Sequence, residues 1–437
     1  MEKFFKLNQR GTDVKTELIA GLTTFMTMAY VLAVQPAAIC GGEAAIVDLN
    51  GVVISKSAIM ISCALISGLV TMLMAFYTNL PFALSTGMGS NFILGALIQA
   101  QVISFGTAMM IVLVSGVVFI VLTVFGLRDL IVRVIPKNIK IAISASIGFF
   151  IAYLGFKNSG IGNFTNGVSL GDVTDPAVIL SIVGLLLTFV LNALNVKGAI
   201  LISILAITLI GIPCGVTQIS GVAAVPDFSD LRNVMFYFDL SNVFTASGII
   251  LVFVCFFGDF FSTLGTVLAV AGRANMLDEN GNLPGIERPF LVDAIGTCVG
   301  ALTGNTTITT FVESTSGVEA GGRSGLASLV TGIMFIVTIF LAPLFVAIPY
   351  CATGPALIYV GFLMLKGFVD IDFSTFDECI GPCVMLMFTA FTGSITNGLG
   401  AGIIVHVLVK LVKGHAKEVH PIMYVLCALM VLYFIVG

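Results

Sequence analysis

The chain has 437 residues, of which 58% are hydrophobic and only 10% are charged. A soluble protein of this length does not need so much apolar surface, whereas a bundle of membrane-spanning helices does. The net charge of −4 is small and spread along the chain, which excludes a nucleic-acid-binding surface.

Apolar segments of roughly membrane length follow one another along the chain. Several are shorter than the ~20 residues of an uninterrupted spanning helix, and the shortest carry clusters of Gly, Ser and Thr. A polar stretch divides them into two sets of seven, and one further apolar run closes the chain. The predicted segments are 17–39, 56–77, 82–99, 106–126, 138–157, 178–194 and 198–213; then, after the polar stretch 214–242, 243–268, 289–303, 306–319, 324–347, 353–368, 378–393 and 396–412; and finally 421–436.

Basic residues indicate the orientation of the bundle, because cytoplasmic loops are enriched in Lys and Arg. One basic group precedes the first segment and another lies between the fourth and fifth, so we expect a cytoplasmic N-terminus and an external 214–242 loop. The stretch 378–412 could be one long helix or a tight pair. A pair keeps the following lysines inside and is preferred, whereas 421–436 could span the membrane or lie in its interface. The basic residues are Lys3, Lys6, Arg10 and Lys15; Arg128, Arg133, Lys137 and Lys140; and Lys410, Lys413 and Lys417.

The third and tenth segments share a pattern. Around 80–91 and again around 307–317, a short extended stretch leads into a helix start rich in small residues. Because seven crossings reverse the chain direction, the second set is predicted to be an inverted copy of the first. Paired interrupted segments are typical of the midplane site of secondary transporters, although small residues could simply let helices pack closely. The predicted parts are a first repeat at 1–213, an inverted second repeat at 243–412 and an extra C-terminal segment at 413–437.

Glu313 lies in the tenth segment with hydrophobic segments on both sides. A carboxylate at bilayer depth costs at least ~2.5 kcal/mol on insertion scales, so it indicates a functional site. Broken backbone at this depth is tolerated only where protein covers it or water lines it, which favours a substrate site. Ser85 or Thr86 is expected to cap the half-helix of the third segment, and Ser314 or Thr315 that of the tenth.

The eighth segment contributes a second acid, Asp259, which is flanked by Phe residues. Desolvation favours its neutral form, so it could carry a proton near neutral pH, or it could only bond a hydroxyl and fix helix packing. Asn91 offers a donor and an acceptor near the first half-helix. Thr27 places a hydroxyl on the first segment, where such groups usually bond their own backbone. Asp293 could belong to the site or could equally be a helix cap.

Several runs of the sequence resemble a known family. GDFFSTLGT at 258–266 and ESTSGVEAGGRSGL at 313–326 resemble signature segments of azaguanine-resistance-type purine permeases, which belong to the nucleobase–cation symporter 2 family. The runs at 10–30, 87–91 and 277–284 are similar as well. The resemblance therefore covers nearly the whole chain, in order.

The resemblance implies an all-α polytopic membrane protein of 14 segments, a 7+7 inverted repeat with core and gate domains. It further implies a homodimer in the plasma (inner) membrane that takes up adenine, guanine or hypoxanthine. The coupling ion would be the proton, with sodium as the other candidate; no further cofactor, no metal and no nucleic acid would take part. The core would comprise segments 1–4 and 8–11 (about 17–126 and 243–347), and the gate segments 5–7 and 12–14 (about 138–213 and 353–412).

Family members also imply roles for individual residues. The acid matching Glu313 bonds the base, the acid matching Asp259 serves binding or coupling, and the Asn matching Asn91 lies in the site. Both acids are thus candidates for proton coupling. This chain departs from the family pattern at Ser262, where members commonly carry a second Asp, so one ionisable group is missing from the site. Candidate stacking partners for the base are Phe256, Phe257 and Phe260.

The same residues bear on two other function classes. A transporter of small anions such as sulfate could share the repeat, since two half-helix N-termini suit an anion, but Glu313 would repel it. An intramembrane enzyme or a channel is not indicated. The sequence holds no His/Glu metal motif, no Ser/His or Ser/Lys pair placed for catalysis and no recognisable pore filter.

Overall fold

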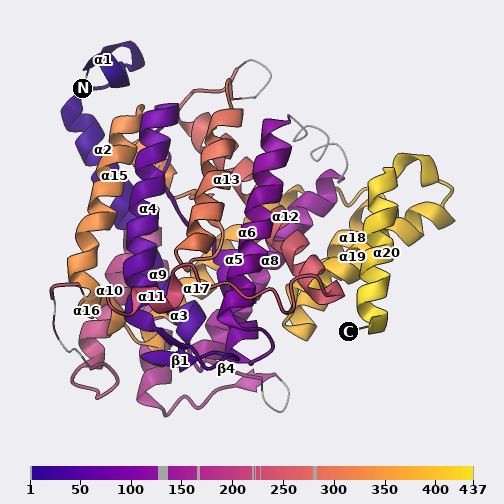
Figure 1. Cartoon of the computed structure of the whole chain (residues 1–437), viewed down its shortest axis with the longest axis horizontal. Coiled ribbons are helices and arrows are strands. Elements are labelled where there is room, and N and C mark those ends of the chain that lie inside the picture. Colours follow the sequence, from indigo (N-terminus) through magenta and orange to yellow (C-terminus); the bar gives the residue numbers. More distant parts are fainter. Residues whose placement is uncertain are drawn as a thin grey trace.

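The computed structural model describes residues 2–125, 136–164, 168–218, 221, 223–226, 228–278 and 283–436. Helices dominate this part of the chain (Figure 1), and eight of those described are long and apolar enough to cross a membrane. The chain is therefore a multi-pass membrane protein, as its composition predicts. Arg128 and Arg133, which contributed to the predicted orientation, lie outside the described residues.

The helices of the first half coincide with the predicted segments. The first segment is broken at Ala29 and Tyr30 into two helices, and the third begins with a short strand. The elements of this half are α1 (Glu2–Phe5), η1 (Asn8–Arg10), α2 (Val14–Met28), α3 (Val31–Cys40), β1 (Ala45–Val47), β2 (Val53–Ser55), α4 (Lys56–Thr78), β3 (Leu84–Thr86), α5 (Met88–Gln99), α6 (Phe105–Val124), α8 (Lys137–Asn158), β4 (Gly162–Asn163), β5 (Ser169–Leu170), α9 (Pro176–Ala193) and α10 (Ala199–Gly211).

The second half repeats this order. The third membrane segment of this half is again a short strand, β6, followed by a short helix, α14. The elements are α11 (Leu231–Val234), α12 (Ala246–Arg273), α13 (Glu287–Leu302), β6 (Ile308–Thr310), α14 (Ser314–Glu319), α15 (Gly325–Val337), η2 (Thr338–Leu341), α16 (Ala342–Val346), α17 (Tyr350–Leu365), η3 (Lys366–Asp370), α18 (Phe376–Thr392), α19 (Ile395–Val412), η4 (Ala416–Glu418) and α20 (Pro421–Val436).

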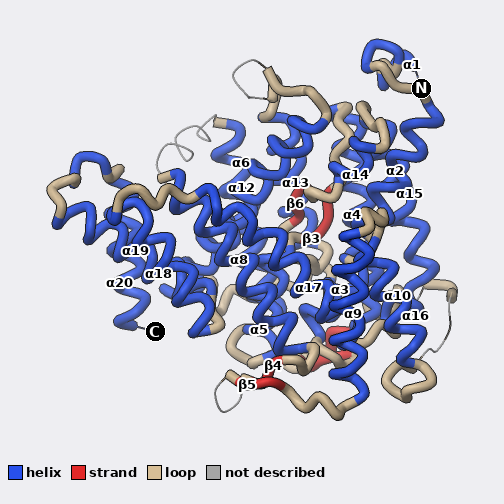
Figure 2. Tube along the Cα trace, turned by 180° about the vertical axis from the view of Figure 1, so that it is seen from behind, coloured by secondary structure: helices blue, strands red, loops and turns tan. Residues whose placement is uncertain are grey.

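The two strands from equivalent positions pair with each other at the centre of the bundle (Figure 2). β3 and β6 are antiparallel, with Ser85 opposite Thr309 at the middle of the register. The pairing gives each strand partners on one edge, as backbone at membrane depth requires. The predicted extended stretches in the third and tenth segments are confirmed.

One threonine holds the outer edge of each strand. The hydroxyl of Thr71 on α4 accepts from the N–H of Leu84 and donates to its carbonyl, both at 3.0 Å. The hydroxyl of Thr297 on α13 does the same for Ile308, at 3.0 and 3.1 Å. Both threonines lie in the second membrane segment of their repeat. The two halves therefore hold their strands by the same pair of hydrogen bonds, here called the clasp.

The helices pack in two groups. α4 contacts α3, α13 and α15, α6 contacts α12 and α13, and α2 contacts α14 and α15. In the second group, α8 contacts α17, α18 and α19, while α9 contacts α10 and α17. α18, α19 and α20 lie together at one side of the molecule, away from α2 and α15 (Figure 1). Contacts of α8 with α5 and α12 join the groups.

The stretch 378–412 forms the predicted tight pair of helices. α18 and α19 meet at Gly393, whose φ of +58° lies in the left-handed region that glycine adopts without strain. Lys410 and Lys413, near the end of α19, lie 3.2 and 2.8 Å from the Asp377 carboxylate at the start of α18. The two helices therefore run antiparallel, and the last helix, α20, packs on α19 and α12.

Candidate binding site

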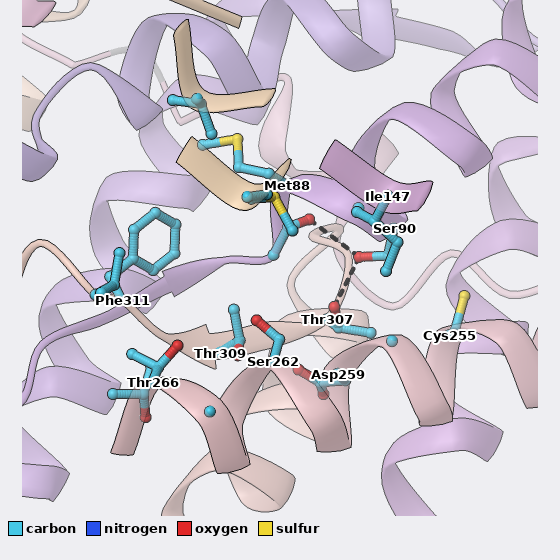
Figure 3. A pocket seen from close by; sticks show the side chains of 18 of the residues that line it. Met88, Ser90, Ile147, Cys255, Asp259, Ser262, Thr266, Thr307, Thr309 and Phe311 are labelled. Atoms are coloured by element: carbon cyan, nitrogen blue, oxygen red, sulfur yellow. Dashed lines mark hydrogen bonds between the residues drawn. The ribbon is translucent and has the colours of Figure 1, made fainter. Parts of the chain in front are cut away.

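A cavity of about 250 Å³ lies where the paired strands and the helices that follow them face α12 (Figure 3). Its volume is just below the ~300–1,000 Å³ of pockets for drug-sized ligands, so it suits a smaller molecule. Most of the wall is apolar, and a few polar side chains converge on it. Its lining includes Tyr30, Met88, Ser90, Ile147, Cys255, Asp259, Ser262, Thr266, Thr307, Thr309, Phe311 and Glu313.

Glu313 lies at the start of the half-helix α14 and lines the cavity. The hydroxyl of Tyr30, between α2 and α3, donates to its Oε1 at 2.8 Å. Tyr30 is almost fully buried, so this bond fixes the carboxylate from the protein side. The arrangement presents an oriented acceptor to a ligand in the cavity.

Asp259 lines the same cavity from α12 and is 5% exposed. The Thr297 hydroxyl, which clasps β6, lies 2.8 Å from Asp259 Oδ2, so it shares its one proton between this carboxylate oxygen and the Ile308 carbonyl. The other oxygen, Oδ1, has no hydrogen-bond partner among the described residues. A buried polar atom without a partner costs about 1–3 kcal/mol, so Oδ1 is suited to receive a proton or a ligand donor.

A second buried acid, Asp293, lies behind the cavity wall. It accepts from the hydroxyl of Thr263 at 2.6 Å and from that of Thr310 at 3.4 Å. Thr263 is also 2.9 Å from the hydroxyl of Thr309, which lines the cavity. The interpretation of Asp293 as a helix cap is wrong, because α13 begins six residues earlier and has Ile286 at its N-cap.

The predicted capping hydroxyls do not cap. The N-cap of α5 is Gly87 and that of α14 is Glu313, and neither makes a side-chain cap bond. The predictions for Ser85, Thr86 and Ser314 as caps are therefore wrong. Ser85 and Thr86 lie in β3 and pair with β6, whereas Ser314, like its alternative Thr315, lies inside α14, after the N-cap residue.

The same hydroxyls instead hold the strands in place. Ser85 bonds Ser67 on α4 at 2.7 Å, and the Thr86 hydroxyl lies 3.7 Å from the Cys63 sulfur. Ser314 accepts from the N–H that precedes β3, at 3.0 Å. All three predicted site residues are fully buried, and none is among the lining of the cavity.

Two further predicted residues, Asn91 and Thr27, are not among the residues that line the cavity. Asn91 is fully buried and accepts from the Thr306 hydroxyl, while its Nδ2 has no partner among the described residues. Thr27 donates to its own helix, at the Thr24 carbonyl 2.8 Å away, and approaches the Glu313 carbonyl at 3.4 Å.

Phe260 packs away from the cavity. Its ring is 5.6 Å from that of Phe119 and 5.4 Å from that of Phe290, in edge-on contacts. Phe256 contacts the same Phe119 ring at 5.8 Å, and neither it nor Phe257 lines the cavity. Among the phenylalanines of the described residues, the one that lines the cavity is Phe311, which follows β6 (Figure 3).

Helical spacing explains which residues of α12 reach the cavity. Cys255, Asp259, Ser262 and Thr266 are three or four residues apart and so share one face of α12. Phe260 follows Asp259 by one residue and points elsewhere. The helical spacing of the sequence alone therefore distinguishes the α12 residues that line the cavity from those that pack against other helices. Ser90 and Thr307, whose hydroxyls are 2.7 Å apart across the wall, come from two repeats and had no such signal.

Comparisons of the sequence with known proteins show its family. A family model described as the permease family matches residues 15–397. A putative permease of Methanocaldococcus jannaschii is 37% identical, over all of this chain and 98% of its own. The adenine permease AdeQ of Escherichia coli is 33% identical over 100% and 96% of the two chains, and the guanine/hypoxanthine permease PbuG of Bacillus subtilis is 35% identical over 100% and 99%.

Solved structures share the fold. The transmembrane domain of the cyanobacterial bicarbonate transporter BicA aligns with a TM-score of 0.62 at 15% identity, covering 89% of this chain and 97% of that domain. The murine anion transporter Slc26a9, in its inward-facing state, aligns at 0.66 and 13% identity over 91% and 68% of the chains. The predicted 7+7 inverted repeat is thereby confirmed. The family model and the sequence relatives show that the chain belongs to the permease family, as its resemblance to purine permeases predicted.

Proposed function

We propose that this protein is a secondary active transporter that takes up purine nucleobases together with protons across the plasma membrane, with its N-terminus in the cytoplasm. The observation that carries the proposal is one small cavity at the strand crossing, lined by two carboxylates, Glu313 and Asp259. The names of the adenine and guanine/hypoxanthine permeases among its relatives support a nucleobase as substrate.

Glu313 is the acceptor for ring N–H groups of the base. Its orientation by Tyr30 suits this role, because an acceptor fixed in advance loses little entropy on binding. A base with the wrong donor pattern would leave buried groups unpaired, at about 1–3 kcal/mol each. Phe311, which lines the cavity where Phe260 does not, takes over the proposed stacking role.

Asp259 is the group that exchanges the coupling proton. Asp259 lines the cavity and has one buried oxygen, Oδ1, without a partner among the described residues, and Thr297 ties its other oxygen to the strand that leads to Glu313. Protonation of Asp259 would therefore be felt by the backbone that carries the binding carboxylate. Coupling requires that the base bind with different affinity to the protein with Asp259 protonated and with Asp259 ionised.

Transport would proceed by movement of the core against the gate. The cavity is lined mainly by the packing group that contains the strands, and Ile147, Val360 and Met364 close it from the other group. The division at about 17–126 and 243–347 against 138–213 and 353–412, and assembly as a homodimer, belong to this proposal.

The small-anion alternative is disfavoured by the same cavity. Two carboxylates face it, and no Lys, Arg or His stands among the described residues that line it. An anion would meet like charges without a compensating cation. The solved neighbours that carry bicarbonate or other anions are 13–15% identical, so they bear on the fold alone.

Uptake of labelled substrates tests the proposal. The chain is expressed in a host without purine permeases, and uptake of adenine, guanine, hypoxanthine, uracil and sulfate is measured at several external pH values. We expect purine uptake that rises as the external pH falls. Purine uptake that ignores the proton gradient contradicts the coupling, and uptake of sulfate alone contradicts the substrate.

A further inference from the structure

A second and larger cavity, of about 560 Å³, lies at the other end of α5 from the paired strands. Its walls come from α5, α6, α8, the start of α12 and the turn between α18 and α19. It has one lining residue in common with the binding cavity, Ile93 on α5. The two cavities therefore meet at Ile93.

Only about one helical turn of apolar side chains separates them. On α8, Ile147 lines the binding cavity and Phe150, three residues on, lines the second one. On α12, Val254 lines the binding cavity and Leu251, three residues earlier, lines the second one. Three residues of α-helix rise about 4.5 Å, so the barrier is thin. All five barrier side chains are buried, with Ile93 and Leu251 at 7% exposed and Phe150 at 4%.

The binding cavity is open at its other end. Gly265 and Ala269, one and two turns beyond Ser262 toward the end of α12, line it and are exposed. In the proposed orientation this end faces the cytoplasm and the second cavity faces outside. The apolar barrier thus lies between the site and the external side.

The second cavity has no charged side chain among the described residues of its wall. Asn242, Thr245, Ser247 and Ser394 supply uncharged polar groups, and the ring of Phe150 and several aliphatic side chains supply the rest. A charged ligand would lose its hydration here without gaining a partner, whereas an uncharged, planar heteroaromatic molecule could stack and hydrogen-bond.

We infer that the second cavity is the external entry chamber for the transported base, and that Ile93 with its neighbours on α8 and α12 is the closed barrier between chamber and binding site. The inference rests on the proposed function, because it takes the purine as the ligand. It adds a second place along the path at which an uncharged base is held.

Filling the chamber tests this. Ala96, on α5, is exposed and lines only the second cavity. Ala96→Phe should reduce purine uptake by about tenfold or more, because the ligand cannot pass the chamber. Equilibrium purine binding to the purified protein should stay within about twofold of the wild type, since the binding cavity is reached from its other end. Ala100→Phe, four residues further on at the C-cap of α5 and outside the lining of both cavities, is the matched control and should leave uptake and binding unchanged.

A second variant decides the case in which Ala96→Phe fails to fold and loses binding as well. Ser247→Cys places a thiol in the chamber wall. A bulky, membrane-impermeant thiol reagent added outside should then inhibit uptake faster than in the wild type, and external purine should slow the reaction. Unchanged uptake by a folded Ala96→Phe variant, or a Ser247→Cys variant as insensitive as the wild type, overturns the chamber. A wild type that neither binds nor transports purines refutes the proposed function instead.

Discussion

The two strand-and-half-helix units share a backbone and differ in chemistry. In each unit a threonine one helix earlier clasps the strand, Thr71 for β3 and Thr297 for β6. Four residues before these threonines stand Ser67 and Asp293, and three residues beyond the strands stand Gly89 and Glu313. At both positions the first repeat carries a neutral residue where the second carries an acid.

This difference indicates how the duplicated fold divides its tasks. An acid buried in a membrane protein is costly, so one that lines or adjoins a cavity indicates function. The first repeat supplies neutral parts, such as the Tyr30 hydroxyl that orients Glu313 and the Ser90 hydroxyl in the cavity wall. The second repeat supplies the acids, Asp259, Asp293 and Glu313. The central claim is that binding and coupling belong to the second repeat on a scaffold that both repeats build.

The largest effect is expected from Glu313→Gln. A hydrogen bond to a charged acceptor is worth about 1.5–3 kcal/mol, so purine affinity should fall by about 10- to 100-fold. Glu319→Gln is the matched control, because Glu319 ends the same half-helix, is exposed and does not line the cavity. Equilibrium binding of labelled purine to purified protein measures both. Equal affinities for the two variants would show that the acid of the second repeat does not bind the base.

Asp259→Asn should separate binding from coupling. The amide keeps the shape of the side chain but cannot exchange a proton, so accumulation against a gradient should be lost while exchange of internal for external purine continues. Uptake and counterflow in proteoliposomes make the comparison. Full accumulation by this variant would assign the coupling proton to another group.

Ser262→Asp places a second acid on the cavity face of α12 and a third acid in the cavity lining. The added carboxylate lies one turn from Asp259, and like charges so close disfavour ionisation of both. We expect a changed order of preference among adenine, guanine and hypoxanthine and a shifted pH optimum of uptake. Competition assays with the three bases measure the order of preference, and uptake at several pH values measures the pH optimum. An unchanged profile would mean that the departure from the family pattern at Ser262 has no bearing on the substrate.

Thr71→Val and Thr297→Val compare the two clasps directly. Each removes two bonds to a strand, at about 0.5–1.5 kcal/mol per bond, so both should lower the free energy of unfolding to a similar extent. Only Thr297→Val also removes a partner of Asp259, and only it should shift the pH dependence of uptake. Thermal unfolding in detergent and uptake at several pH values test this. The same pH shift in both variants would argue against a division between the repeats.

The smallest effect is expected outside the membrane, at Asp239. Its carboxylate accepts from Ser104 at 2.7 Å and Asn50 at 2.9 Å, which ties the loop before α12 to α6 and the β1–β2 hairpin. The Ser241 hydroxyl holds the pKa of Asp239 well below its usual range. The Asp239 carboxylate therefore stabilises the folded state above the unfolded pKa of about 3.9, and this stabilisation is lost as the pH falls.

Asp239→Asn should accordingly cost less than about 1 kcal/mol, because the group is partly exposed. Melting temperatures of variant and wild type should differ near neutral pH and converge in acid, with purine affinity the same in both. A gap that widens in acid would contradict the sign of the pKa shift.

Much of the fold could be predicted from the sequence. Segment lengths, the clusters of small residues and the charge pattern predicted the helices, the extended stretches and the pair at 378–412, because each follows from local chain chemistry. The pairing of Ser85 with Thr309 across the two repeats could not be read from one sequence, since it depends on how distant elements meet.

The site was predictable only in part. Glu313 and Asp259 stand out because acids are rare in apolar segments, and the structure brings both to one cavity. The capping roles of Ser85 and Ser314 were wrong because hydroxyls beside a strand have other partners within reach. The position of Phe260 could have been corrected from helical spacing alone.

The most direct test of the central claim is proton uptake on substrate binding. Purified protein is mixed with purine in weakly buffered solution that contains a pH-sensitive dye, and the wild type is compared with Asp259→Asn. Because coupling between two ligands is reciprocal, purine binding should draw a proton onto the wild-type protein and none onto the variant. Purine binding without proton uptake in the wild type, or equal uptake by Asp259→Asn, would contradict the assignment of coupling to the second repeat.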